Sequence, residues 1–177
     1  MTDFLFRDDA YARECRAEVA FHGAEGIRLD RTVAYPRGGG QPGDSGVLRR
    51  LSHHAVVRIA DTVKGEGPDE ILHIPEDGSR VQFEAGDSVE LEIDFDRRHR
   101  LMRVHTLLHL LSSVVGGRVT GGQVHDDGRG RLDFDVEESI DADSVTTALN
   151  ALVQANHPVA ARWVTEEELD ENPDLVK

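Results

Sequence analysis

The hydrophobic pattern changes its period near Asp96, and this change limits the folds that the chain can adopt. Before Asp96, apolar residues alternate in short runs that are separated by turns, which is typical of strands in a small barrel. After it, apolar residues recur at helical spacing. The pattern predicts strands at residues 14–21, 27–35, 55–63, 70–74 and 88–95, followed by a helix at residues 97–115.

The second half mixes helices with strands. Asp94 or Asp96 is expected to cap the first helix, and Gly116-Gly117 to end it. We expect a strand at 131–136, a helix at 142–156, a strand at 158–164 and a short helix opened by a capping box at Thr165. The sequence therefore predicts an α+β chain, with a β-barrel domain at 1–95 and an α/β domain at 96–177.

The charge is strongly acidic. The 177 residues carry 34 Asp and Glu against 20 Lys and Arg, a net charge of −14. Of the 20 basic residues, 18 are Arg, and Lys64 and Lys177 are the two lysines. Carboxylates stay hydrated in concentrated salt and Arg is more weakly hydrated than Lys, so we interpret this composition as salt adaptation. A merely acidic protein is the alternative.

Several classes of protein are disfavoured. No apolar run approaches the roughly 20 residues of a membrane helix, and the N-terminus does not resemble a secretory signal, so we expect no membrane partner. The single cysteine, Cys15, excludes an internal disulfide and favours a cytoplasmic location.

His105 and His109 are the sharpest local feature. Histidines at positions i and i+4 share one face of a helix and can bind one metal ion. The alternative is a pair of partly buried histidines that hydrogen-bond within the fold. Thr106 stands where a zinc protease of the His-Glu type needs its glutamate, so that class is disfavoured. Four arginines precede the pair and favour either a solvated face or contact with phosphates: Arg97, Arg98, Arg100 and Arg103.

A glycine-rich segment at residues 37–46 is the second feature. Gly38, Gly39 and Gly40 allow a backbone to approach a ligand closely or to adopt positive φ, although a flexible hairpin connection is an equal alternative. The segment is not a phosphate-binding P-loop, because no Gly-Lys-Ser/Thr follows. His125 and Asp126 are candidate metal ligands, but a surface loop is the better interpretation of residues 118–127.

Together these segments resemble a known family. Residues 29–36, leading into Gly38-Gly39-Gly40-Gln41-Pro42-Gly43-Asp44-Ser45-Gly46, resemble the glycine-rich segment of alanyl-tRNA synthetase editing domains and of the free-standing AlaX-type trans-editing proteins. Residues 93–98 and 102–111 resemble that family's first zinc-binding motif, and residues 131–135 and 163–177 resemble later segments. Each motif alone is a weak to moderate sign of the family, but the order of the motifs along nearly the whole chain is specific for it.

The resemblance implies a small β-barrel joined to an editing domain that is shared with threonyl-tRNA synthetases. It implies hydrolysis of tRNA(Ala) mischarged with serine, and sometimes with glycine. His105 and His109 would be the first pair of zinc ligands, and the loop Gly38, Gly39, Gly40 and Gln41 would position the aminoacyl group. Thr32 and residues 120–123 are weaker candidates for lining the pocket. No general base is identifiable.

One departure from the family concerns the metal. The second ligand motif, CxxxH, is absent, because Cys15 lies in the strand-rich half with Val19 where the histidine should be. Two histidines are too few for catalytic zinc, which usually has three protein ligands. We expect a shortened version of a longer protein in preference to a natural variant without the site. A non-catalytic module that binds tRNA or an aminoacylated ligand is the main alternative function, and a synthetase that aminoacylates tRNA is disfavoured.

Overall fold

The computed structural model describes residues 2–52, 55–160 and 162–172. The chain forms two compact units. Unit 1 contains Met1–Val104 and Val124–Arg129, and unit 2 contains His105–Gln123 and Gly130–Lys177. The expected domains at residues 1–95 and 96–177 stay a prediction. None of the helices among the described residues is both long and apolar enough to cross a membrane.

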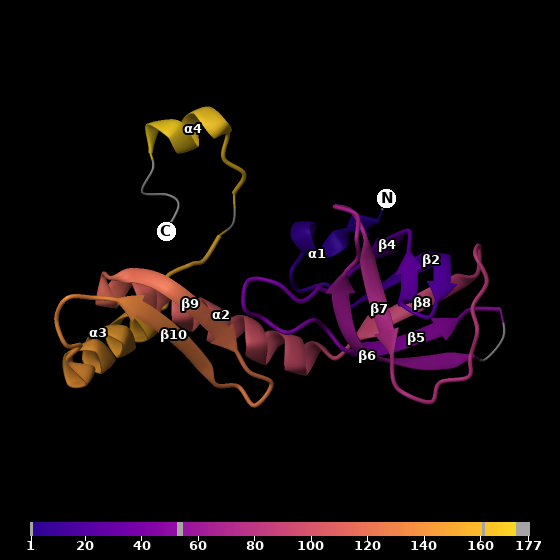
Figure 1. The fold of residues 1–177 in the computed structure, drawn as a ribbon, viewed down its shortest axis with the longest axis horizontal. Helices are drawn as coiled ribbons and strands as arrows, with labels where there is room; N and C mark the ends of the chain where they lie inside the picture. The colour runs from indigo at the N-terminus through magenta and orange to yellow at the C-terminus, as the bar shows by residue number, and fades with distance from the viewer. Residues whose placement is uncertain (1, 53–54, 161, 173–177) are drawn as a thin grey trace. The chain divides into compact units, whose positions relative to one another are not determined.

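Unit 1 is built on a closed six-stranded barrel (Figure 1). Its strands follow the order β2-β3-β7-β6-β5-β8. Their bounds are β2 Glu14–Gly23, β3 Gly26–Leu29, β5 Gly46–Arg50, β6 Val56–Lys64, β7 Ile71–Pro75 and β8 Ser88–Ile93. The short strands β1 (Asp3–Phe4) and β4 (Arg31–Thr32) pair in parallel, and α1 spans Leu5–Asp8. The structure thus confirms an α+β fold that contains a small barrel.

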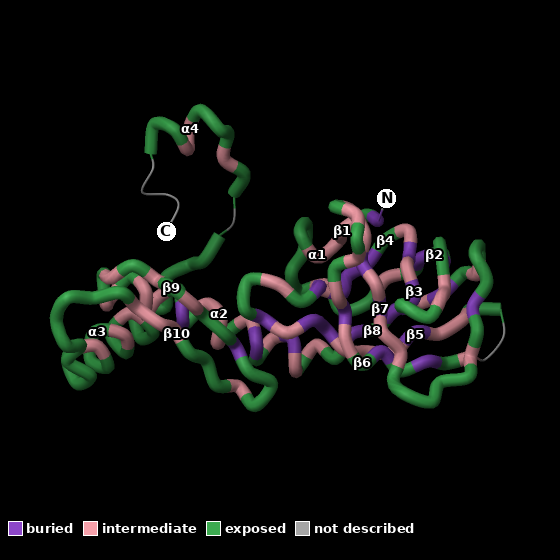
Figure 2. Tube along the Cα trace, in the orientation of Figure 1, coloured by how far each residue is buried: buried purple, intermediate pink, exposed green. Residues whose placement is uncertain are grey.

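Alternating side chains fill the barrel. In β2, Ala17 and Val19 are buried while Arg16 and Glu18 are exposed, as the period of two requires. Figure 2 shows buried segments along the barrel strands. The largest fully buried apolar side chains of the barrel strands are Ile27, Leu29, Leu48, Ile71, Leu91, Val19, Val57 and Val89. Closure leaves the barrel sheet without open edges.

The alternation of Cys15, Ala17, Val19 and Phe21 predicts that these side chains share one face of the strand. For Phe21 this prediction is wrong. The register between β2 and β3 shifts between Val19 and Phe21, which is the mark of a β-bulge. A bulge adds one residue to a strand and turns the following side chains to the other face. Phe21 is therefore 37% exposed.

Two strand boundaries also differ from the prediction. The expected strand at 27–35 breaks at Asp30, whose carboxylate accepts a hydrogen bond from the Glu18 backbone nitrogen at 2.7 Å. Glu18 lies in β2, so the Asp30 carboxylate takes the place of a backbone carbonyl as acceptor at this point between the two segments. The expected strand at 88–95 ends at Ile93, because Asp94 caps the next helix by accepting a bond from the Arg97 nitrogen at 3.0 Å.

The helix α2, Phe95–Val115, begins in unit 1 and ends in unit 2. Gly116 follows with φ of 72°, a conformation that suits a glycine after a helix. Unit 2 further contains β9 (Arg118–Val124, whose last residue belongs to unit 1), β10 (Gly130–Asp135), α3 (Ala142–Ala155) and α4 (Glu166–Glu171). The Thr165 hydroxyl accepts a bond from the Glu168 nitrogen at 3.2 Å, so the predicted cap of α4 is confirmed.

Two predictions in the second half are wrong. Residues 118–124 form strand β9, paired with β10, although their glycines favoured a loop. Residues 158–160 and 162–164 are not a strand, and residue 161 of that predicted strand lies outside the described residues. No strand partner for this segment occurs among the described residues, and Val159 and Trp163 are 79% and 87% exposed. The resemblance noted for residues 163–177 partly falls on residues 173–177, which also lie outside the described part.

Candidate functional site

The glycine-rich segment lies between β4 and β5, and Asp44 holds its two ends together. The Asp44 carboxylate accepts a hydrogen bond from the Tyr35 nitrogen at 2.7 Å, and the Asp44 nitrogen donates to the Tyr35 carbonyl at 2.9 Å. The Thr62 hydroxyl donates to the Asp44 carbonyl at 2.8 Å. Asp44 is 1% exposed, so these bonds fix the base of the loop inside unit 1.

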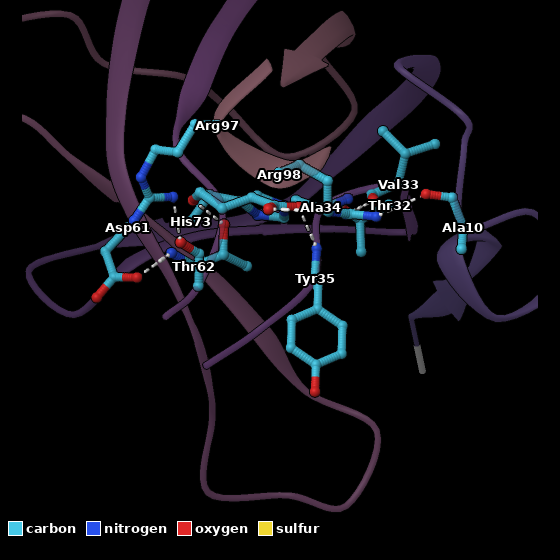
Figure 3. Close-up of polar contacts among 12 residues, drawn as sticks. Ala10, Thr32, Val33, Ala34, Tyr35, Asp61, Thr62, His73, Arg97 and Arg98 are labelled. Carbon is cyan, nitrogen blue, oxygen red and sulfur yellow. Dashed lines mark hydrogen bonds and ion pairs between the residues drawn. The ribbon is translucent and has the colours of Figure 1, made fainter. Parts of the chain in front are cut away.

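Arg98 neutralises the buried carboxylate of Asp44. Its Nε donates to both Asp44 oxygens, at 2.9 and 2.7 Å, and its Nη2 forms an ion pair with one of them. Nη2 also donates to the Val33 carbonyl at 2.7 Å, and Nη1 donates to the Ala10 carbonyl at 3.1 Å, as Figure 3 shows. A buried ion pair is tolerated when further hydrogen bonds satisfy it in this way. Arg98 is 2% exposed, so the prediction that it belongs to a solvated or phosphate-binding arginine face is wrong.

The tip of the loop is a tight turn. The Gly38 nitrogen donates to the Gln41 carbonyl at 3.1 Å, and the Gln41 nitrogen donates to the Gly38 carbonyl at 3.0 Å. The two central residues, Gly39 and Gly40, have φ of 56° and 75°, which L side chains rarely adopt, so glycine is required there. Both are exposed, whereas Gln41 is 4% exposed. The loop therefore presents bare backbone at Gly39 and Gly40.

The loop is also held against strand β6 and the start of α2. A side chain at Gly43 would collide with the Thr62 carbonyl, so only glycine fits. The Gly43 carbonyl accepts a bond from Arg97 Nη1 at 2.8 Å. Arg97 Nε in turn donates to Asp126 at 3.0 Å, within the segment Val124–Arg129 of the same unit. The Val124 nitrogen donates to the Gly40 carbonyl at 2.8 Å.

Thr32 lies inside the barrel unit and is fully buried. His73 Nδ1 lies 2.9 Å from the Ile27 carbonyl, which can only accept, so Nδ1 carries the proton and Nε2 is the acceptor. The Thr32 hydroxyl donates to that Nε2 at 2.9 Å and accepts from the Ala34 nitrogen at 3.0 Å. Burial lowers the pKa of His73 to about 4, which keeps this ring neutral. The hydroxyl of Thr32 is thus engaged in the frame beneath the loop.

His105 and His109 lie together on α2, in unit 2. Their ring centroids are 5.0 Å apart and the ring planes differ by 15°. Burial, and secondly the charge of His109, lower the pKa of His105. A lowered pKa favours the neutral imidazole, which is the form that binds a metal. The glycine loop and Thr32 belong to unit 1, whereas the histidine pair belongs to unit 2. The predicted site residues thus form two groups, one in each unit.

Other candidate ligands do not complete a site within the described part of the chain, where no three His, Cys, Asp or Glu side chains gather as a metal cluster. Asp126 is bound by Arg97. His125 begins a turn, with its carbonyl accepting a bond from the Gly128 nitrogen at 3.0 Å. Cys15 is half-buried in β2, and burial raises the pKa of its thiol.

Comparison with curated proteins identifies relatives along almost the entire chain. The alanyl-tRNA editing protein AlaX-M of Methanosarcina acetivorans is 36% identical over 97% of this chain and 73% of its own length. The chain belongs to the alanyl-tRNA editing protein family. AlaX-M of Pyrococcus horikoshii is 40% identical over 65% of this chain and 49% of its own length. The alanine–tRNA ligase of Halobacterium salinarum is 34% identical over 96% of this chain, which is 19% of the ligase. No family model matches the chain.

For this member of the family, the structure adds residues that the motifs alone did not single out. Arg98 and His73 are both buried and both support the candidate loop. His73 was not a candidate in the sequence, and Arg98 was expected only as one of four arginines on a solvated or phosphate-binding face. His73 carried a weak signal, since it occupies an inward position of a strand with alternating burial. No sequence signal distinguished Arg98 from Arg100, which is exposed. The two residues are two positions apart on one helix, so they point to different faces and one can be buried while the other is exposed.

Proposed function

We propose that this protein hydrolyses the ester of tRNA(Ala) mischarged with serine, and also with glycine, acting in trans with the help of one zinc ion. The observation that carries the proposal is the 36% identity to an alanyl-tRNA editing protein over 97% of the chain, with the glycine loop and the histidine pair in the family's order. The proposed partner is therefore the aminoacylated tRNA, and the proposed fold of the second half is the editing domain.

We assign roles to the residues as follows. Gly39 and Gly40 offer exposed backbone next to which the aminoacyl group can lie without steric conflict. Gly38 and Gln41 close the turn that holds this backbone in place. Thr32, through His73, supports the strand that leads into the loop. Arg98 and Asp44 fix the base of the loop, and none of these residues is assigned as a general base.

His105 and His109 fit one half of a zinc site. Their one-face spacing suits two ligands of one ion, and the lowered pKa of His105 favours the neutral, metal-binding form of that imidazole. When bound, zinc with an open coordination position supplies an activated water or polarises the ester carbonyl. Because the described residues provide only this pair, we expect the 177-residue chain to bind zinc weakly and to release serine slowly. Tight one-to-one binding would contradict that expectation and point to further ligands such as His125 or Asp126.

The histidine assignment is tested by H105A and H109A. In an otherwise complete protein, which also supplies the remaining zinc ligands, we expect each variant to lower zinc affinity at least tenfold and to abolish release of serine from seryl-tRNA(Ala), because two-point attachment on one helix face is lost. Isothermal titration with zinc and a deacylation time course measure the two effects. H157A, which removes an exposed histidine outside the pair, is the matched control and should behave as the parent protein. Unchanged zinc binding and serine release in the double variant would remove the histidines from the site.

The absence of a three-ligand cluster among the described residues favours a second candidate, a non-catalytic module that binds aminoacyl-tRNA. This module would bind seryl-tRNA(Ala) without shortening the lifetime of its ester, whether zinc is present or chelated. The deacylation time course separates the two functions, because an editing enzyme releases serine faster in the presence of zinc.

A further inference from the structure

A cleft on unit 1 lies where the β2–β3 and β6–β7 hairpins meet. Its volume is about 510 Å³, and its lining includes Phe21 of β2, Arg28 of β3, Lys64 of β6 and Leu72 of β7. This volume is within the range of small-molecule sites, roughly 300–1,000 Å³. None of these residues belongs to the glycine loop or the histidine pair, so the proposed chemistry does not account for the cleft.

The cleft combines an aromatic ring with two cations. The bulge in β2 exposes Phe21, and the Arg28 guanidinium lies 5.8 Å from the centre of its ring. Arg28 pairs with Glu70, whose carboxylate also accepts a bond from the Gly67 nitrogen at 3.2 Å. That pairing neutralises one carboxylate of the lining. An exposed aromatic ring beside a guanidinium is a surface on which a nucleobase can stack.

Lys64 is the cation of the cleft that has no acidic partner among the described ion pairs. It stands out because 18 of the 20 basic residues are arginine, and because the chain carries 14 excess negative charges. Its ammonium lies 3.6 Å from the position that a side chain on Gly38 would take. The cleft therefore reaches the glycine loop through Lys64, all within unit 1.

Two glutamates in the cleft, Glu25 and Glu66, form no ion pair with any described residue. Carboxylates in such a position accept hydrogen bonds from exocyclic amino groups, such as N4 of cytosine or N6 of adenine. The lining thus offers a ring for stacking, an ammonium for a phosphate and acceptors for a base that carries an amino group.

We propose that this cleft binds one unpaired nucleotide with an amino-bearing base, stacked on Phe21 and with its phosphate at Lys64. The proposal rests on the proposed function, because an RNA whose aminoacylated end lies at the glycine loop would place a neighbouring unpaired nucleotide in the cleft. Cytidine and adenosine nucleotides are the expected ligands, and uridine nucleotides are disfavoured since they present no amino group to the carboxylates.

The test titrates the full chain with cytidine 5′-monophosphate and uridine 5′-monophosphate while backbone amide shifts are followed by NMR at constant salt. We expect cytidine monophosphate to shift amides at the β2–β3 and β6–β7 turns and to bind at least fivefold more tightly than uridine monophosphate. K64Q should weaken this binding about fivefold, because a charged hydrogen bond to phosphate is lost. F21A should weaken it about tenfold through lost stacking. R58Q, which removes an exposed cation elsewhere on β6, should leave it unchanged.

A second arm uses a single-stranded RNA ending in CCA, which distinguishes a site for RNA from one for free nucleotides. An RNA site binds the oligonucleotide more tightly than the mononucleotide, with the same K64Q loss, whereas a free-nucleotide site binds the two equally. Neither readout needs ester hydrolysis, so a chain that binds cytidine monophosphate but releases no serine would overturn the proposed function and leave the cleft standing. Shifts outside the cleft, or equal affinity of K64Q and the parent chain, would overturn the cleft assignment.

Discussion

At the scale of single residues, the most informative group is His73, a buried titratable side chain in a barrel whose surface is acidic. Its ring uses both nitrogens, one as donor to Ile27 and one as acceptor from Thr32. A protonated ring would have two donors, so Nε2 could no longer accept from the hydroxyl. Burial and the bond from Thr32 favour the neutral ring, and burial outweighs the bond to the Ile27 carbonyl, which by itself raises the pKa.

His73 predicts an acid-sensitive fold. Its pKa is about 4 in the folded chain and about 6.5 when unfolded, so between these values only the unfolded state takes up the proton. Stability from this group is complete above pH 6.5 and falls as pH decreases towards 4, by about 3 kcal/mol in total. Urea unfolding at several pH values and constant salt measures the slope, and H73Q should flatten it. An equal slope in both proteins would show that other groups cause it.

At the scale of elements, the glycine loop is held by α2 through one buried ion pair. Arg98 comes from the first turns of the helix, and Asp44 from the end of the loop. The side chains are 3% and 1% exposed, so solvent does not screen the pair. Removing one partner leaves the other charge buried alone, which typically costs about 3–5 kcal/mol.

This pair is testable by a double-mutant cycle. R98M strands the carboxylate and D44N strands the guanidinium, so each should destabilise the chain by about 3 kcal/mol or more. The double variant R98M/D44N should lose clearly less unfolding free energy than the sum of the two single losses, because neither charge remains unpaired. The amide oxygen that replaces the carboxylate can still accept from the Tyr35 nitrogen. Chemical unfolding of the four proteins gives the coupling free energy. Additive losses would mean that the two side chains act independently of one another.

The same elements show what the sequence can and cannot predict. Period and turn residues located α2 and five of the six barrel strands, because these signals are local, but β5 (Gly46–Arg50) was not predicted. The break at Asp30 and the bulge before Phe21 were missed, since each depends on pairing with a distant strand. The histidine pair was visible because its spacing lies on one helix. The roles of Arg98 and His73 could not be predicted, because their partners are distant in the chain. Asp44 is 54 residues from Arg98, and Thr32 and Ile27 are 41 and 46 residues from His73.

At the scale of the whole molecule, the charge of −14 dominates. Most ion pairs that the structure describes are at least partly exposed, as for Arg49 with Glu92 and Arg131 with Asp133. Exposed pairs contribute little, with a median of about 0–1 kcal/mol each, so screening them costs little stability. Repulsion among the excess carboxylates acts over longer distances. Salt should therefore stabilise this chain on balance.

The expected outcome is a melting temperature that rises with salt concentration. At about 0.1 M salt the Debye length is about 10 Å and neighbouring carboxylates repel one another, whereas at about 1 M it shrinks to about 3 Å. The α4 segment, with Glu166, Glu167 and Glu168 in its first turn, exemplifies such crowding. Calorimetry in potassium chloride from dilute to molar concentration measures the trend, and sucrose of equal osmolality is the uncharged control. Sucrose raises melting temperatures by exclusion from the protein surface but does not screen charge, so the rise in salt beyond the rise in sucrose measures screening. A melting temperature that is the same in dilute and molar salt would show that repulsion does not limit this fold.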